Sequence, residues 1–153
     1  MPNMYIRFLF LGYRIFCFLF RPVRMGVRVM MIQDSKVTLV RQTYLPGWFM
    51  PGGGLKRGET LDQAARREAF EETGAELGKV WLMGAYTSFK DWKTDHNLVF
   101  VCEDFKITGK PDSEIAEIQS FPLDALPAGL WPGHVRRLEE YKTGQANPQF
   151  GEW

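Results

Sequence analysis

Three glutamates occur together in one short stretch of the sequence, at Glu68, Glu71 and Glu72. If this stretch is helical, positions i, i+3 and i+4 are neighbours, so the three carboxylates form one cluster. The same periodicity places Glu68 and Glu72 on the apolar face of the helix, where burial and mutual repulsion both raise carboxylate pKa values. A divalent cation removes both costs, because carboxylate oxygens are the ligands that Mg²⁺ and Mn²⁺ prefer. The spacing therefore predicts a metal site on this helix.

A glycine-rich loop comes directly before the predicted helix. Gly52, Gly53 and Gly54 follow Pro51, and glycine allows a backbone to approach a ligand closely and to adopt positive φ. Backbone groups exposed in such a loop can meet a phosphate or a metal ion. Most runs of three glycines are only flexible turns, so this loop gains significance from its place beside the three carboxylates.

The loop and helix together resemble the Nudix box, a motif written G-x(5)-E-x(7)-R-E-U-x-E-E-x-G-U, in which U is a bulky aliphatic residue. All seven fixed residues occur at the required spacing, namely Gly53, Glu59, Arg67, Glu68, Glu71, Glu72 and Gly74. Ala69 and Ala75 hold the two U positions and are smaller than the family pattern, a departure that concerns packing rather than metal binding. A Trp-x-x-Pro-Gly-Gly sequence at residues 48–53 extends the similarity.

The resemblance implies a hydrolase that uses Mg²⁺, or Mn²⁺ in its place, to cleave a pyrophosphate bond in a nucleoside diphosphate linked to another moiety. Carried over by position, Glu68 and Glu72 are the main metal ligands, and Glu71 binds a second metal ion or positions the attacking water. The Gly53 carbonyl is a further expected ligand. Metal ions of this kind neutralise a diphosphate, orient it and make water more acidic, and a carboxylate assists as general base.

Two other box residues, Arg67 and Glu59, are expected to pair and to hold the helix against the loop. Family members often draw the general base, or another metal ligand, from a glutamate outside the box. Glu114 and Glu117 are the candidates in this chain, although each is equally well interpreted as a solvated loop acid.

Several side chains outside the box are candidates for contacts with the rest of the substrate. Arg41 could meet a phosphate, and Trp48 or Tyr44 could stack on a base, although a single tryptophan more often packs in a core. Asp95 and His96 begin a predicted central strand. There they could face the substrate or form an ordinary junction between a loop and a strand.

The helix that carries the box has clear start and stop signals. Thr60 and Gln63 have the spacing of a capping box at its first turn, and Gly74 suits the position just after its last turn. Before it, residues 26–33 and 36–42 are rich in β-formers and predict a hairpin.

Three further strands and a second helix follow the box. The strands are predicted at residues 79–89, 96–107 and 114–123, and the second is apolar on both alternations, which indicates a buried central strand. Residues 131–144 predict a helix with Pro132 in its first turn and with Val135, Leu138 and Tyr141 on its inner side. This order predicts an α/β fold with a mixed β-sheet between helices in a single domain, similar to the α/β/α sandwich of the Nudix family.

Composition supports one ordinary globular domain. The chain has 153 residues, is 45% hydrophobic and carries a formal net charge of +1. Without a basic excess, composition makes no case for binding nucleic acid. Cys17 and Cys102 lie in apolar surroundings and are interpreted as buried free thiols of a protein in a reducing, cytoplasmic compartment. A homodimer is compatible with the sequence but does not follow from it.

The predicted hydrolase domain, residues 22–144, lies between two other segments. Residues 145–153 are interpreted as a polar tail that ends in an exposed aromatic, Trp153. Residues 1–21 form an N-terminal hydrophobic element whose apolar run, residues 4–20, is shorter than the about 20 residues of a spanning helix and lacks a signal-peptide cleavage site.

Arginines interrupt this apolar run at regular intervals. In a helix, Arg7, Arg14 and Arg21 make one narrow cationic stripe on an otherwise apolar cylinder. Such a cylinder favours packing against the hydrolase domain or a sister subunit. Reversible attachment to anionic membranes is an alternative, and a pair of strands turning at Gly12 is another.

Two other classes of function compete with a hydrolase. The first is a Nudix-like module that binds nucleotides for regulation without catalysis, but such modules usually lose box carboxylates and this chain keeps them all. The second is the isomerase branch of the superfamily, which acts on isoprenoid diphosphates through an active-site cysteine. Cys17 precedes the domain and Cys102 lies within a strand away from the box, so the sequence disfavours this branch.

Overall fold

The computed structural model describes residues 4–144 and 147–153. Residues 1–3 of the N-terminal element and residues 145–146 of the expected tail lie outside the described residues, as does the side chain of Arg7.

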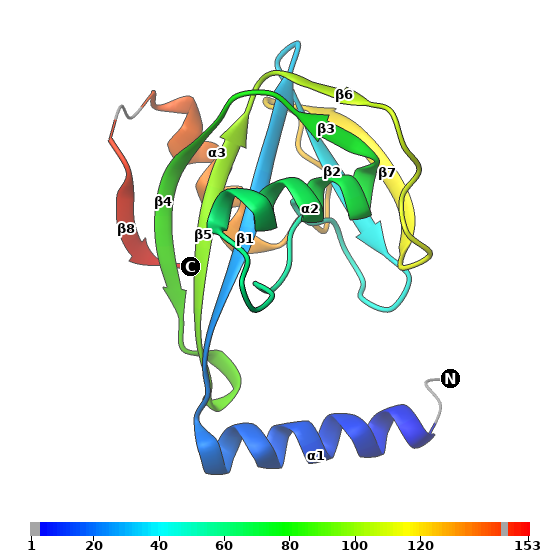
Figure 1. Cartoon of the computed structure of the whole chain (residues 1–153), viewed down its shortest axis with the longest axis vertical. Coiled ribbons are helices and arrows are strands. Elements are labelled where there is room, and N and C mark those ends of the chain that lie inside the picture. The colour runs from blue at the N-terminus through cyan, green and yellow to red at the C-terminus, as the bar shows by residue number, and fades with distance from the viewer. Residues whose placement is uncertain (1–3, 145–146) are drawn as a thin grey trace.

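A six-stranded mixed sheet forms the centre of the molecule (Figure 1). Its strands are β1 (Val23–Gln33), β2 (Lys36–Gln42), β4 (Val80–Ser88), β5 (Thr94–Cys102), β7 (Ile115–Pro122) and β8 (Gln149–Glu152). Their order across the sheet is β7-β2-β1-β5-β4-β8. β1 pairs antiparallel with β2, as the predicted hairpin requires, and parallel with β5. The mixed α/β class and the central position of β5 are as the sequence predicts.

One helix covers each face of this sheet (Figure 1). α2 (Leu61–Thr73) packs on the face where Val27, Val29 and Phe100 are buried. α3 (Pro132–Lys142) packs on the opposite face, where Met30, Leu39 and Val101 are buried, and its Leu138 is fully buried there. The result is a sandwich of helix, sheet and helix with two apolar layers.

The predicted capping of α2 is confirmed. The Thr60 hydroxyl accepts a bond from the Gln63 N–H at 3.2 Å, and the Gln63 side chain accepts one from the Thr60 N–H at 2.9 Å. Gly74 ends the helix with a left-handed φ of 71°. Ala69 and Ala75, at the two U positions of the box, are fully buried, so the small side chains bring α2 and the next segment close to the sheet.

The prediction of one strand over residues 96–107 is wrong. β5 ends at Cys102, and β6 (Phe105–Ile107) belongs to a separate two-stranded sheet with β3 (Ala75–Leu77), which the sequence analysis did not predict. The chain turns between them because the Asp104 carbonyl accepts bonds from the Cys102 thiol at 3.1 Å and from the Gly78 N–H at 2.7 Å.

The prediction of a polar tail with an exposed aromatic is also wrong. β8 pairs in parallel with β4, and the Trp153 N–H donates to the Thr87 carbonyl at 2.9 Å. The Trp153 ring packs edge-on against His134, with ring centroids 5.0 Å apart. Gly133 makes room for this ring, because a Cβ at that position would lie 2.4 Å from Trp153 Nε1. Packing of the partly buried indole thus secures the end of the chain on the sheet.

The N-terminal run forms a helix, α1 (Met4–Phe20), so the alternative of two strands turning at Gly12 is wrong. The helix leads into β1 and lies apart from the sandwich (Figure 1), close to a short 3₁₀ turn, η1 (Lys90–Trp92). Within residues 4–144 and 147–153, no helix has both the length and the apolar character needed to cross a bilayer.

Candidate active site

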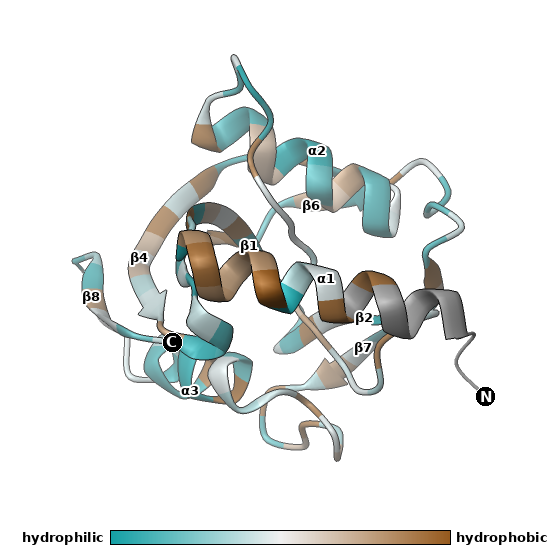
Figure 2. Cartoon of the chain, turned by 90° about the horizontal axis from the view of Figure 1, so that it is seen from below, coloured by the Kyte–Doolittle hydropathy of each residue, from teal (hydrophilic) through white to brown (hydrophobic). Residues whose placement is uncertain are grey.

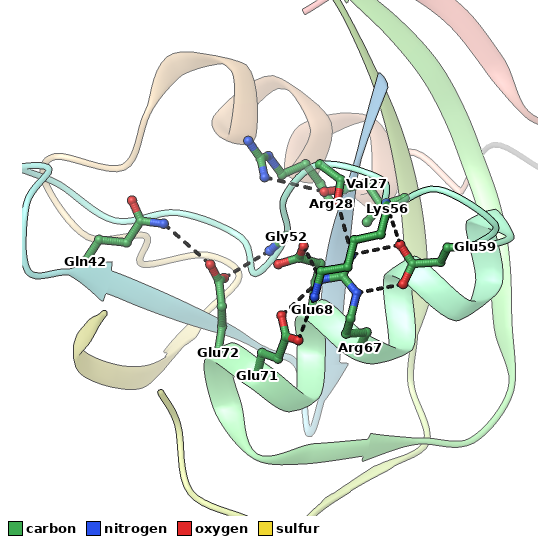
Figure 3. A network of polar contacts seen from close by, with 11 residues as sticks. Val27, Arg28, Gln42, Gly52, Lys56, Glu59, Arg67, Glu68, Glu71 and Glu72 are labelled. Atoms are coloured by element: carbon green, nitrogen blue, oxygen red, sulfur yellow. Dashed lines mark hydrogen bonds and ion pairs between the residues drawn. The ribbon is translucent and has the colours of Figure 1, made fainter. Parts of the chain in front are cut away.

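Arg67 lies at the centre of a polar network on α2 (Figure 3). Its Nε and Nη2 donate to both carboxylate oxygens of Glu59, at 2.6 and 2.9 Å. Its Nη1 donates to Glu68 at 2.6 Å and to Glu71 at 2.9 Å, and its Nη2 also reaches the Gly54 carbonyl at 3.1 Å. The bonds that Glu59 accepts from Arg67 and from the Lys56 N–H lower the pKa of its carboxyl group to about 2. The two-pronged pair ties α2 to the loop before it.

Glu72 lies outside the Arg67 network, on the side of Gln42 (Figure 3). Its carboxylate accepts a bond from the Gly52 N–H at 3.0 Å and one from the Gln42 side chain at 3.4 Å. Burial raises the pKa of Glu72 to about 7, and the negative charge of Glu68 acts in the same direction, although the Gly52 N–H and Arg28 oppose the rise. Two carboxylates therefore meet here in a partly desolvated place, where a cation would stabilise both charged forms.

The glycine loop brings its backbone directly against these acids. The loop runs beside β1, with the Gly53 carbonyl accepting from the Val27 N–H at 2.9 Å and the Pro51 carbonyl accepting from the Val29 N–H at 2.8 Å. A Cβ on Gly53 would lie 2.6 Å from an oxygen of Glu68. A Cβ on Gly52 would lie 2.1 Å from the Val27 carbonyl. Glycine at position 52 lets the loop pass against the β1 backbone, and glycine at position 53 leaves room for the Glu68 carboxylate.

Two adjoining pockets open around this loop, with volumes of about 300 and 280 Å³. They share a boundary made by Gln42, Tyr44, Gly52 and Gly53. The first pocket, here called the carboxylate pocket, is also lined by Lys56, Arg67, Glu68, Glu71, Glu72, Asp112, Glu114 and Ile115. The second, here called the Arg28 pocket, is also lined by Arg24, Met25, Gly26, Arg28, Leu45, Gly54, Lys93, Asp95, His96 and Asn97. A ligand that filled both would place one end against the acids and the other against Arg28.

Arg28 is a polar residue of this site that the sequence analysis missed. Its Nε is buried and has no hydrogen-bond partner among the described residues, and its Nη1 makes only a long bond of 3.4 Å to the Val27 carbonyl. Burial lowers the pKa of this guanidinium, while the charges of Glu72 and Glu68 oppose the change. The signal in the sequence was a single arginine inside an apolar strand, where a buried charge calls for a partner.

The structure divides the expected contact residues outside the box into two groups. Glu114 and Tyr44 line the carboxylate pocket, and Asp95 and His96 line the Arg28 pocket. Burial raises the pKa of the Tyr44 hydroxyl, and the nearby Glu114 carboxylate acts in the same direction.

The other three expected contact residues lie together elsewhere. Arg41 forms an ion pair with Glu117, and its guanidinium lies 5.7 Å from the centre of the Trp48 ring. Trp48 packs edge-on against Phe121 in the apolar layer below α3, with ring centroids 4.9 Å apart. Neither the carboxylate pocket nor the Arg28 pocket includes any of the three.

The acids fit a hard divalent cation, although they do not form a ready-made cage. Within the described part of the chain, no three acidic, histidine or cysteine side chains converge as metal ligands, and the Arg67 Nη1 occupies an oxygen of both Glu68 and Glu71. Mg²⁺ is commonly bound by one or two carboxylates together with waters and substrate phosphates. Glu68 and Glu72, beside an exposed glycine backbone, supply that donor set.

The fold and the site define a class of enzyme. A mixed sheet between helices, with a glycine loop clamped onto a helix that bears three clustered glutamates, is the arrangement of a hydrolase of phosphoanhydride bonds of the Nudix type. The family model of the NUDIX domain matches residues 22–141. The chain therefore belongs to the Nudix family and is a MutT-like hydrolase that acts on pyrophosphate bonds. Nudix hydrolases generally use divalent metal ions.

Named relatives and solved structures agree with this membership. The chain is 39% identical over 144 residues to an RNA pyrophosphohydrolase of Rickettsia bellii, which covers 86% of this chain and 73% of the relative. It is 32% identical over 114 residues to an ADP-ribose pyrophosphatase of Methanocaldococcus jannaschii, covering 71% of this chain and 67% of the relative. A solved NUDIX hydrolase from Nitrosomonas europaea superposes with a TM-score of 0.69 at 27% identity, over 79% of this chain and 89% of that one.

Proposed function

We propose that this Nudix hydrolase uses Mg²⁺ or Mn²⁺ to cleave the pyrophosphate bond of a nucleoside diphosphate linked to another moiety. The observation that carries the proposal is the pair of partly desolvated carboxylates, Glu68 and Glu72, beside the glycine loop at the junction of two pockets. One pocket is acidic and suits a metal-bound diphosphate. The other offers a buried guanidinium and suits the remainder of the substrate.

Glu68 and Glu72 would hold the cation, with the Gly53 carbonyl as a further ligand. That carbonyl already accepts one bond from Val27, which leaves its second lone pair free. The cation would neutralise the diphosphate and make a nearby water more acidic. Arg67 keeps Glu68 and Glu71 in place, so Glu71 is positioned to orient the water or to bind a second ion.

Glu114 is the better of the two candidates for the general base. It lines the carboxylate pocket, whereas the Glu117 carboxylate is paired with Arg41 outside it. A base must lie within hydrogen-bond reach of the proton it removes, directly or through one water. Glu114 shares the pocket with the proposed metal ligands, which supports this choice, and Glu71 is the alternative within the box.

Arg28 would bind the part of the substrate beyond the diphosphate. Its guanidinium and the Asn97 amide both line the Arg28 pocket and offer donors to a phosphate, a carbonyl or a base edge. We expect Arg28→Gln to raise KM by about tenfold or more with a smaller change in kcat, because the lost contact lies away from the bond that breaks. Arg41→Gln, outside both pockets, is the matched control and should leave KM unchanged. A fall in kcat alone would contradict this role of Arg28.

The proposed reaction is tested by a screen of candidate substrates with Mg²⁺ or Mn²⁺. The panel contains nucleoside triphosphates, sugar nucleotides, ADP-ribose, NADH and dinucleoside polyphosphates, with a 5′-triphosphorylated oligonucleotide added because of the name of the Rickettsia relative. Products are identified by chromatography and phosphate release. Metal-dependent cleavage between two phosphates supports the proposal. Tight nucleotide binding without turnover of any compound would overturn it and favour the alternative, a non-catalytic regulatory module.

A further inference from the structure

The N-terminal helix α1 concentrates many exposed apolar side chains in one short segment. It lies beside the sandwich as a mostly apolar rod, which Figure 2 shows from below. Eight of its large apolar side chains are between 38% and 69% exposed, namely Leu9, Leu11, Tyr13, Ile15, Phe16, Phe18, Leu19 and Phe20. A contiguous patch of this kind is rare on monomers and marks a surface that binds something.

The helix is nevertheless fixed to the hydrolase domain along one side. Arg24 donates to the Tyr13 hydroxyl at 2.7 Å, and Cys17 is only 1% exposed. The Phe18 ring packs edge-on against Trp92 of η1, with centroids 5.2 Å apart, and the Arg21 guanidinium lies 5.7 Å from the centre of the same ring. The exposed side of α1 is therefore held in one orientation relative to the domain.

The apolar surface of α1 continues onto the domain. Val23 and Met25 at the start of β1 are exposed, and so are Phe89 and Trp92 around η1. We call α1 together with residues 21–25 and 89–93 the basal surface.

The basal surface is strongly cationic. Residues 4–25 contain four arginines and no acid, and residues 89–93 add Lys90 and Lys93 against one acid, Asp91. The formal charge of this surface is therefore +5 in a chain whose total is +1, so the remaining residues sum to −4. The nearby Asp95 is already paired with Lys93 at 2.9 Å and with Arg24 at 4.0 Å.

This combination of charge and apolar area identifies the partner. A second copy docking through α1 would bring arginines against arginines, because α1 offers no acid to pair with them. Lipid phosphates would neutralise these arginines, while the aromatic and aliphatic side chains enter the boundary between head groups and acyl chains. The polar side that an isolated interfacial helix needs is replaced here by the domain, which covers Cys17 and bonds to the Tyr13 hydroxyl.

We propose that the basal surface docks the hydrolase on anionic phospholipid membranes, with α1 lying in the plane of the interface. The 17-residue α1 is too short to span a bilayer, and an in-plane helix needs no spanning length. The basal surface contains none of the box residues, and it adjoins the Arg28 pocket through Arg24, Met25 and Lys93.

The full chain is tested by sedimentation with vesicles of phosphatidylcholine alone or with about 30% phosphatidylglycerol. We expect binding only to the anionic vesicles and weaker binding at high salt, because exposed charges are screened. Arg14→Glu combined with Arg21→Glu should lower the bound fraction by about tenfold or more, because each basic residue near an anionic surface contributes to attraction. The matched control is Arg136→Glu, an exposed arginine on α3, which should bind as the wild type does.

A second pair of variants tests the apolar part of the basal surface. Leu19→Ser with Phe20→Ser should also lower vesicle binding, whereas Phe150→Ser, at an 82% exposed position on β8, should not. Circular dichroism and thermal melting check that each variant folds. Equal binding of the wild type to neutral and anionic vesicles, or no binding at all, would overturn the proposal. A dimer seen by light scattering that the Leu19 and Phe20 changes dissociate, in a protein that does not bind vesicles, would also overturn it.

Discussion

At the scale of single residues, the site depends on two glutamates that are held in different ways. Glu68 is bound by Arg67 at 2.6 Å, whereas Glu72 is bound by the Gly52 N–H and keeps a pKa raised to about 7 by burial. Glu72 is therefore the acid whose charge a cation would stabilise most. The bonds from the Gly52 N–H and from Gln42 hold the side chain at position 72, so we expect a change of its charge to leave the backbone in place.

Glu72→Gln should lower kcat/KM by at least about 100-fold, because the stabilisation that a metal ion gives is worth several kcal/mol. The variant should keep its circular dichroism spectrum, and its melting temperature without metal should be equal or higher, since a repelling carboxylate is gone. Glu117→Gln, an acid outside the pocket, is the control. Turnover of Glu72→Gln near the wild-type rate at saturating Mg²⁺ would refute the assignment of Glu72 as a ligand.

Two adjacent glycines should respond differently to the same substitution. In Gly53→Ala the new methyl meets the end of the Glu68 side chain, which can move aside, so we expect at least a tenfold loss of kcat with a small change in melting temperature. In Gly52→Ala the methyl meets the Val27 backbone, and Gly52 has a φ of 150°, so we expect lower stability, by about 1–3 kcal/mol. Thermal melts and steady-state kinetics on both variants give the comparison. Equal losses of stability in the two would contradict it.

At the scale of elements, α3 carries a titratable group in the apolar layer. His134 is 3% exposed, and its Nδ1 has no hydrogen-bond partner among the described residues. Burial, followed by the charge of Arg28, lowers the pKa of His134 to about 3. The ring packs between Phe49 and Trp153, so it joins α3 to the last strand, β8. A proton on Nδ1 would be shielded from solvent and would have no acceptor among the described residues.

This burial makes stability depend on pH in a defined direction. The unfolded chain binds a proton on His134 below about pH 6.5, whereas the folded chain does not until about pH 3. Burial of neutral His134 therefore costs the fold no stability above pH 6.5. As the pH falls from 6.5 toward 3, the free energy of unfolding decreases, because only the unfolded chain takes up the proton. Between pH 7 and pH 5 the loss is about 2 kcal/mol.

His134→Phe should remove this part of the acid destabilisation. The free energy of unfolding of wild type and variant is measured by urea denaturation at each pH. From pH 7 to pH 5 the wild type should lose about 2 kcal/mol more than the variant does. Comparison at equal pH cancels the titration of all other groups. A constant difference between wild type and His134→Phe across this range would contradict the burial argument.

At the scale of the whole molecule, charge is distributed unevenly between two regions. Five acids line the carboxylate pocket, whereas arginines gather on the basal surface, in α1 and at the start of β1. A cation at the carboxylate pocket would bind only the folded chain, because the acids come together through the pairing of the loop with β1 and α2. Binding that is restricted to the native state adds stability by mass action.

Mg²⁺ or Mn²⁺ should therefore raise the melting temperature of the wild type. At a concentration 100-fold above Kd the gain is about 2.7 kcal/mol, which corresponds to several degrees for a domain of this size. A non-hydrolysable nucleoside diphosphate analogue should increase the shift. The Glu72→Gln variant is the control and should lose most of it. Melting temperatures that do not respond to millimolar metal, alone or with the analogue, would count against a metal site.

The part of the site that could be predicted from the sequence is the part made by local geometry. The spacing of Glu68, Glu71 and Glu72 fixes their neighbourhood on a helix, and the capping residues Thr60 and Gly74 fix where that helix begins and ends. Both depend only on residues a few positions apart. The same holds for the hairpin of β1 and β2, whose two-residue turn leaves one pairing register.

Only the tertiary structure decided which distant residues join the acids. Arg41 and Gln42 are adjacent in the sequence, yet Gln42 reaches Glu72 and Arg41 pairs with Glu117 away from it. The reason is that successive strand residues point to opposite faces, and an irregularity between Arg41 and Gln42 shifts the register with β7. Sheet pairings that no local pattern specifies also place Arg28 beside the site, through β1 and β5, and Trp153 against α3, through β4 and β8. The sequence by itself determined the chemistry of the box, and the folded sheet determined what that chemistry faces.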